Sequence, residues 1–99
     1  MWLGTVAGRV WADRQLPQLA GRRLVLVTDV LSDRSEVAVD LVDAGIGSTV
    51  LVTTDEAASS ASGESIVDLA VVALVAGHDP LPRERRGSGE APRVVEADA

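Results

Sequence analysis

The sequence predicts an all-β fold, a small barrel or sandwich of five short strands. Valine, a residue that favours strands, accounts for 16 of the 99 residues. Short runs of alternating or continuous apolar residues are separated by segments with clear turn chemistry. A chain of this length holds one domain with one modest core.

The predicted strands cover residues 2–11, 24–30, 36–41, 50–54 and 69–75. The first strand alternates, and we expect one face to carry Trp2, Gly4, Val6, Gly8 and Val10. Two glycines on a buried face indicate close packing or a coil in the strand. The second strand is apolar on both faces in its middle.

The third strand alternates cleanly, which predicts inward and outward sets of side chains. The inward set is Val37, Val39 and Leu41, and the outward set is Glu36, Ala38 and Asp40. The run over 66–75 fits either a strand or a buried helix, and its β-branched density favours the strand. A short helical turn is expected over 56–62, where it would cap one end of a barrel.

Two segments punctuate these strands, at 16–21 and 43–48. In the second, Gly45 and Gly47 are expected to supply positive φ angles. Residues 1–79 form the predicted barrel domain, and 80–99 a flexible tail containing Pro, Gly and Arg. Within the tail, Val94 and Val95 could add a short edge strand.

Composition excludes several kinds of site. The chain has no cysteine and a single histidine, which rules out a disulfide frame, a thiolate zinc site and a cysteine nucleophile, and we expect neither a metal nor a cofactor. The apolar run 2–11 is interrupted by Thr5 and Arg9 and is too short for a membrane span or a signal segment. We therefore expect a cytoplasmic protein with no membrane partner.

Candidate catalytic groups are sparse. Asp40 and Asp43 form the best carboxylate pair, but we expect Asp40 to cap a turn amide and Asp43 to face solvent. His78 and Asp79 are adjacent on the chain, so they are expected to point apart at a strand end. We expect no enzyme.

Nucleic acid is not an expected partner. The net charge is −6, and two tryptophans are the only aromatic residues, whereas single-strand binding needs a basic groove and stacking rings. The local basic spots Arg22–Arg23 and Arg83–Arg86 are expected to be paired with acids or solvated.

The chain has more apolar side chains than the core of one small domain can bury. The second strand is apolar on both faces, and Leu3, Trp2 and Trp11 also need an apolar environment. We infer self-association.

These residues resemble a known family, the vertex proteins of bacterial microcompartment shells, of the carboxysome and ethanolamine-compartment type. The resemblance spans about residues 1–79, and four stretches carry it: Leu3-x-x-Val6-x-Gly8-x-Val10, Leu19-x-Gly21-x-x-Leu24-x-Leu26-Val27, Ala38-x-Asp40-x-Val42-Asp43-Ala44-Gly45-x-Gly47-x-x-Val50-Leu51-Val52 and Asp68-x-x-Val71-Val72-Ala73-Leu74-Val75. The chain departs from the family pattern at several positions. Asp43 replaces the first glycine of Gly-Ala-Gly, Arg23 replaces a lysine, and Ala73 replaces a glycine.

The resemblance implies an OB-like β-barrel that assembles as a homo-pentamer, caps the vertices of a microcompartment shell and lets facets of hexameric shell proteins close. It implies that Asp43, Ala44, Gly45 and Gly47 lie where the loop meets neighbouring hexamers. For contact between subunits the candidates are Trp2, Trp11, Val25 and Val27. A stand-alone oligomeric module that binds a small ligand or peptide is the alternative function.

Overall fold

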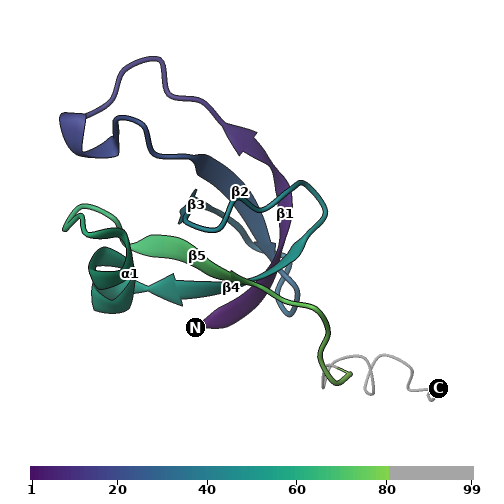
Figure 1. Ribbon diagram of the computed structural model, residues 1–99. Helices are drawn as coiled ribbons and strands as arrows, with labels where there is room; N and C mark the ends of the chain where they lie inside the picture. Colours follow the sequence, from purple (N-terminus) through teal and green to yellow (C-terminus); the bar gives the residue numbers. More distant parts are fainter. Residues whose placement is uncertain (81–99) are drawn as a thin grey trace.

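Five strands close into a barrel in the computed structural model, which describes residues 1–80. The elements are β1 (Trp2–Val10), the 3-10 turn η1 (Pro17–Leu19), β2 (Leu24–Asp29), β3 (Ser35–Asp40), β4 (Thr49–Thr54), α1 (Asp55–Ser62) and β5 (Leu69–Leu74). Around the barrel the order is β1-β2-β3-β5-β4 (Figure 1). All neighbours are antiparallel except β3 and β5, which are parallel.

The predicted fold class is confirmed: the chain is a closed five-stranded barrel with one short helix. Each predicted strand is present, and 66–75, which fitted either a helix or a strand, contains strand β5. The helical turn is slightly longer than expected and ends at Gly63, whose left-handed backbone (φ 78°) lets its N–H bond the Ser59 carbonyl. The predicted tail, with its edge strand at Val94 and Val95, lies outside the described residues from 81 onward.

The barrel interior is filled by valines. Their β-branched side chains are stiff, so they pack tightly in a narrow barrel without losing much rotamer freedom. The fully buried members are Val6, Val25, Val27, Val50, Val52 and Val71.

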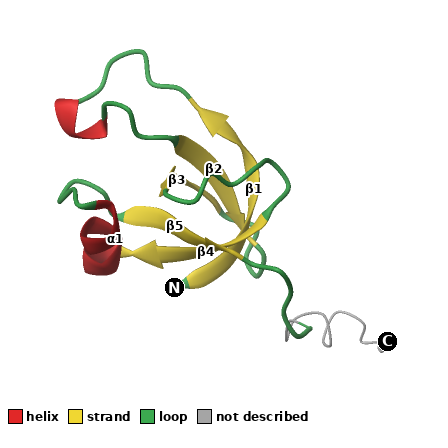
Figure 2. Cartoon of the chain, in the orientation of Figure 1, coloured by secondary structure: helices red, strands yellow, loops and turns green. Residues whose placement is uncertain are grey.

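A second apolar cluster lies on the other face of the sheet from this interior. It joins Val39 of β3 and Ala70 of β5 to Ala58 of α1, and Leu24 of β2 packs against its edge. In Figure 2 the red helix α1 lies beside the ends of β4 and β5. Part of the barrel's outer surface is therefore buried by the chain itself.

The predicted faces of β3 are wrong. Ala38 and Asp40 are buried, at 2% and 7% exposure, whereas Val37 is 44% exposed. Ala38 pairs with Val25 across the sheet, and directly opposed residues share a face, so Ala38 points inward with Val25. Val39 is buried as expected, but in the outer cluster, where it packs with Ala58, Val67 and Ala70. A strand covered on both sides does not reveal its inner face by alternation.

The predicted face of β1 holds only for its first half. The register with β2 shifts between Val6 and Gly8, a β-bulge that reverses the alternation. Gly8 then lies opposite Leu26, which alternates with buried neighbours and so points outward. Gly4 remains inside, where an added Cβ would collide with Val27 and lie 2.9 Å from the Trp2 ring. Only Gly4 thus serves the close packing expected of both glycines.

No helix within residues 1–80 has both the length and the apolar character that crossing a bilayer requires.

Candidate functional site

The loop between β3 and β4, residues 41–48, is held by the carboxylate of Asp40. This side chain has no solvent exposure. Its Oδ1 accepts a hydrogen bond from the Val42 N–H at 3.0 Å, and its Oδ2 accepts one from the Ala44 N–H at 2.8 Å. Two backbone donors are thereby satisfied by one charged acceptor, which fixes the first half of the loop.

Arg23, one residue before β2, bridges Asp40 to the loop. Its Nε lies 3.2 Å from Asp40 Oδ2, and its Nη1 lies 3.2 Å from Asp43 Oδ1. The Nε contact lacks hydrogen-bond alignment and is a charge pair only. Asp43 is 84% exposed in its side chain. The expectation for both carboxylates is confirmed: Asp40 caps turn amides and Asp43 faces solvent.

The left-handed positions of the loop differ from those expected. Gly47 has φ 90°, as predicted, but Gly45 does not lie in the left-handed region. Asp43 does, with φ 57°. Aspartate tolerates this region better than most residues that carry a Cβ, because its short polar side chain bonds locally. Here that side chain is paired with Arg23.

The second half of the loop is attached to the middle of β1. The Gly47 N–H donates to the Val6 carbonyl at 2.8 Å, and the Val6 N–H donates to the Ser48 carbonyl at 3.0 Å. Between its two anchors the loop exposes Asp43, Gly45, Gly47 and Ile46, the last at 70%. Ile46 was not among the residues proposed from the sequence.

Ala44 is a correction. Its side chain is 2% exposed and belongs to the barrel core, so it cannot reach a neighbouring molecule. Val25 and Val27 are a second correction, because both have no exposure and point into the barrel. An apolar run on both faces of a strand does not show which face is inside. The outward residues of β2 are Leu24 and Leu26.

The two tryptophans lie in different surroundings. Trp2 is half-buried and packs against the barrel core. Trp11, just after β1, is 80% exposed. Among the proposed subunit contacts, only Trp11 therefore presents most of its side chain to solvent.

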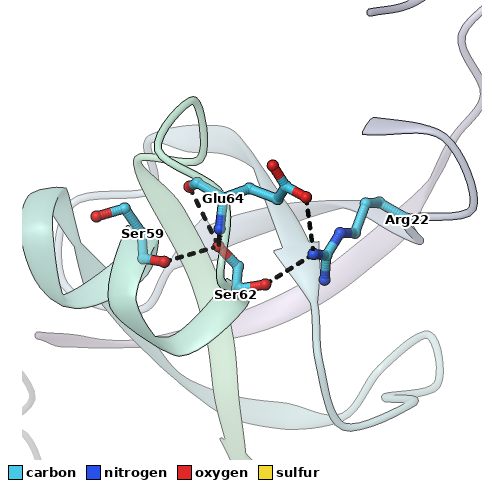
Figure 3. Close-up of polar contacts among 4 residues, drawn as sticks. All are labelled: Arg22, Ser59, Ser62 and Glu64. Atoms are coloured by element: carbon cyan, nitrogen blue, oxygen red, sulfur yellow. Dashed lines mark hydrogen bonds and ion pairs between the residues drawn. The ribbon is translucent and has the colours of Figure 1, made fainter. Parts of the chain in front are cut away.

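Arg22 ties the segment before β2 to the end of α1 (Figure 3). Its Nη2 donates to the Ser62 carbonyl at 2.7 Å and lies 3.5 Å from Glu64 Oε2. The Ser62 hydroxyl in turn accepts from the Glu64 N–H at 3.2 Å. The last carbonyls of a helix lack partners within it, so a cation here is favourable. The expectation that Arg22 and Arg23 pair with acids is confirmed.

His78 and Asp79 form no catalytic pair of side chains. The histidine Nδ1 lies 2.6 Å from the Asp79 backbone carbonyl, not from its carboxylate, and both residues are exposed. Within residues 1–80, no group of three His, Asp or Glu lies close enough together to hold a metal ion.

Comparison with known proteins agrees with this geometry. The model of the family described as "Ethanolamine utilisation protein EutN/carboxysome" matches residues 1–76. The chain belongs to this family. The match covers every strand of the barrel and the loop 41–48.

Two relatives of the EutN/carboxysome family carry a name that states a role. The microcompartment shell vertex protein PduN of Salmonella typhimurium is 39% identical over 87 residues, covering 76% of this chain and 94% of PduN. The shell vertex protein GrpN of Rhodospirillum rubrum is 35% identical over 82 residues, covering 76% of this chain and 92% of GrpN. The predicted identity as a shell vertex protein is confirmed, and with it the expected localisation to a microcompartment shell.

Solved structures of the family have the same fold. The structure of GrpN, described as a pentameric microcompartment shell protein, has a TM-score of 0.74 at 29% identity and covers 82% of this chain and 100% of its own. The CcmL structure from Nostoc has a TM-score of 0.71 at 32% identity, covering 76% of this chain and 88% of its own.

Proposed function

We propose that five copies of this chain form a ring that closes a vertex of a microcompartment shell, where it meets facets of hexameric proteins. The observation that carries this is the barrel's likeness, along its whole length, to a relative described as a pentameric shell protein. A flat hexagonal lattice does not curve, and a five-fold unit at each corner supplies the curvature. The role is geometric, and we assign the chain no catalytic step.

The exposed part of the loop 41–48, at Asp43, Gly45 and Gly47, is the proposed contact with the hexamers. Its support is physical. The loop is anchored at both ends, by Asp40 and by the hydrogen bonds to Val6, so little ordering entropy is lost when a neighbour docks. Glycines without side chains let a neighbouring backbone approach closely. Ala44 contributes through core packing that supports the loop.

Co-expression with a hexameric shell protein tests the function. With this chain present, electron microscopy of purified particles should show closed polyhedral shells. Without it, the same hexamer should give open sheets or tubes. Equal yields of closed shells in both preparations would contradict the proposal, because closure would then not depend on a vertex unit.

The contact loop is tested by Gly45→Val. An added Cβ at this position meets only Ser48 Oγ, at 3.8 Å, and the backbone is not left-handed, so the barrel should fold normally. We expect an unchanged oligomer mass but a loss of at least tenfold in closed shells, because the branched side chain holds the hexamer's backbone away. Gly77→Val is the matched control, since that exposed glycine also has open space around its Cβ position. Closed shells at parental yield with Gly45→Val would remove the loop from the contact.

A further inference from the structure

Gly8 is a glycine that nothing within the described chain requires. It lies inside strand β1, where glycine loses packing and gains backbone freedom in the unfolded state. Its backbone is not left-handed, and a Cβ built there meets no atom within 4 Å. Gly4, on the same strand, has no such space. A strand glycine often marks a bulge, a tight bend or a site where another backbone approaches closely. The bulge of β1 lies beside Gly8, but it leaves the Gly8 backbone outside the left-handed region, so the bulge does not demand a glycine there and close approach is the remaining reason.

The surroundings of Gly8 are apolar. Leu26 lies opposite Gly8 on β2, and Val37 lies opposite Leu26 on β3. These three residues form one row across the outside of the barrel, because Leu26 alternates with the buried Val25 and Val27. Val37, at 44% exposure, is the most open of the row's apolar side chains. We call this row the Gly8 flank.

A second apolar row runs across β1, β4 and β5. Leu3 lies opposite Leu51, and Leu51 lies opposite Ala73. All three are half-buried, and Leu51 points outward because it alternates with the buried Val50 and Val52. Neither β4 nor β5 contains a charged residue. We call this row the Leu51 flank.

The two flanks lie on opposite sides of β1 in the barrel order, one over β2 and β3, the other over β4 and β5. A ring of identical subunits needs this arrangement, because each head-to-tail junction joins two different surfaces of the same chain. An isologous dimer would use one surface twice. Two separate apolar flanks therefore fit a ring better than a two-fold pair.

We propose that the Gly8 flank of one copy packs against the Leu51 flank of the next copy in the ring, an inference that rests on the proposed five-fold ring. The absent side chain at Gly8 leaves room for the neighbour's outward leucines beside Leu26 and Val37. Both surfaces are free of charge along their rows, so their burial removes apolar area from water without desolvating an ion.

Gly8→Arg tests the first surface. Because the Cβ position is open, the variant should fold, and its thermal unfolding followed by circular dichroism should remain cooperative. Native mass spectrometry should show a monomer where the parent chain shows a pentamer, with at least a tenfold loss of pentamer. Gly77→Arg adds the same charge at an equally open glycine outside both flanks and should stay pentameric.

Leu51→Arg tests the second surface and should also give a monomer. If circular dichroism shows that it does not fold, Ala73→Arg takes its place, because Ala73 lies opposite Leu51 in the same row and is only half-buried. The decisive step is to mix the two monomeric variants. The Gly8→Arg variant keeps an intact Leu51 flank, and the Leu51→Arg variant keeps an intact Gly8 flank. These two flanks can form one junction, and no further copy can then be added because both remaining flanks are altered. We expect a 1:1 heterodimer and nothing larger.

The outcomes separate this inference from the proposed function. A parent chain that is monomeric contradicts the ring itself. A pentameric parent with a pentameric Gly8→Arg variant overturns the inference alone. Two monomeric variants that remain monomers after mixing, at a concentration where the parent is fully assembled, overturn the pairing of the two flanks.

Discussion

Asp40 and Asp43 contact the same guanidinium at the same distance, yet their contributions to the free energy of unfolding differ because only Asp40 is buried. Both lie 3.2 Å from Arg23, but the Asp40 side chain has no exposure and that of Asp43 is 84% exposed. Water screens an exposed pair and competes for its hydrogen bonds, so such pairs contribute little. Water cannot reach a buried carboxylate that accepts hydrogen bonds from two backbone amides, so it cannot replace those bonds when the carboxylate is removed.

The matched substitutions Asp40→Asn and Asp43→Asn test this difference. Asp40→Asn turns a donor toward one of the two amides and leaves Arg23 without its buried partner, so we expect a loss of about 2–4 kcal/mol in the free energy of unfolding. Asp43→Asn keeps a residue that tolerates the left-handed backbone, and we expect a change of about 0.5 kcal/mol or less. Urea unfolding at one fixed protomer concentration measures both, and similar losses for the two variants would contradict the account.

At the residue scale, the sequence predicted the roles of Asp40 and Asp43 but not the backbone of the loop. The cap at Asp40 followed from a carboxylate just before a glycine-containing turn, with no catalytic partner near it in sequence. The left-handed position was assigned to Gly45 because glycine is the usual residue there, but it belongs to Asp43. Residue type gives only a preference at such positions, since aspartate also occupies this region.

At the element scale, strands were predictable and their faces were not. β-Branched density and turn residues located every strand. The predicted faces were wrong where the chain departs from simple alternation, at the bulge before Gly8 and on β3, whose outer residue Val39 is buried in the second apolar cluster. Both departures depend on long-range register and packing, which the local pattern does not contain. For the same reason Val25 and Val27 were assigned to the subunit contact although they fill the core.

The link between the β1–β2 connection and α1 depends on Arg22. Replacing it by methionine removes the bond to the Ser62 carbonyl and the pair with Glu64. The two side chains are 27% and 30% exposed, so we expect a loss of about 1 kcal/mol rather than the full value of a buried charged bond. Amide hydrogen exchange should also quicken at Gly63, whose N–H closes the last turn of α1.

Arg34→Met is the control for that substitution. Arg34 pairs with Glu36 at 3.7 Å, with side chains 75% and 40% exposed, and its removal should cost less than about 0.5 kcal/mol. If Arg22→Met left both the unfolding free energy and the exchange at Gly63 at the values of Arg34→Met, the bond between Arg22 and α1 would have no measurable role in stability.

At the scale of the whole molecule, the sequence indicated self-association without locating the surface. A small domain has one interior, so a strand that is apolar on both faces leaves one face for something else. The structure shows that part of this surplus is covered by α1. Outward-facing apolar residues form two rows on either side of β1. Other apolar side chains are exposed outside these rows, among them Trp11, Leu16, Ile46, Ile66 and Leu74. Which row meets which in a ring depends on the assembled geometry, which a single chain's pattern does not specify.

The subunit count of the purified chain tests the central claim most directly. Native mass spectrometry at the concentration at which the protein is stored should give a single species with five times the mass of the chain. That result would place the chain in closed five-fold rings. A stable monomer, or a ring of six, would contradict the account, because neither can supply the curvature of a vertex.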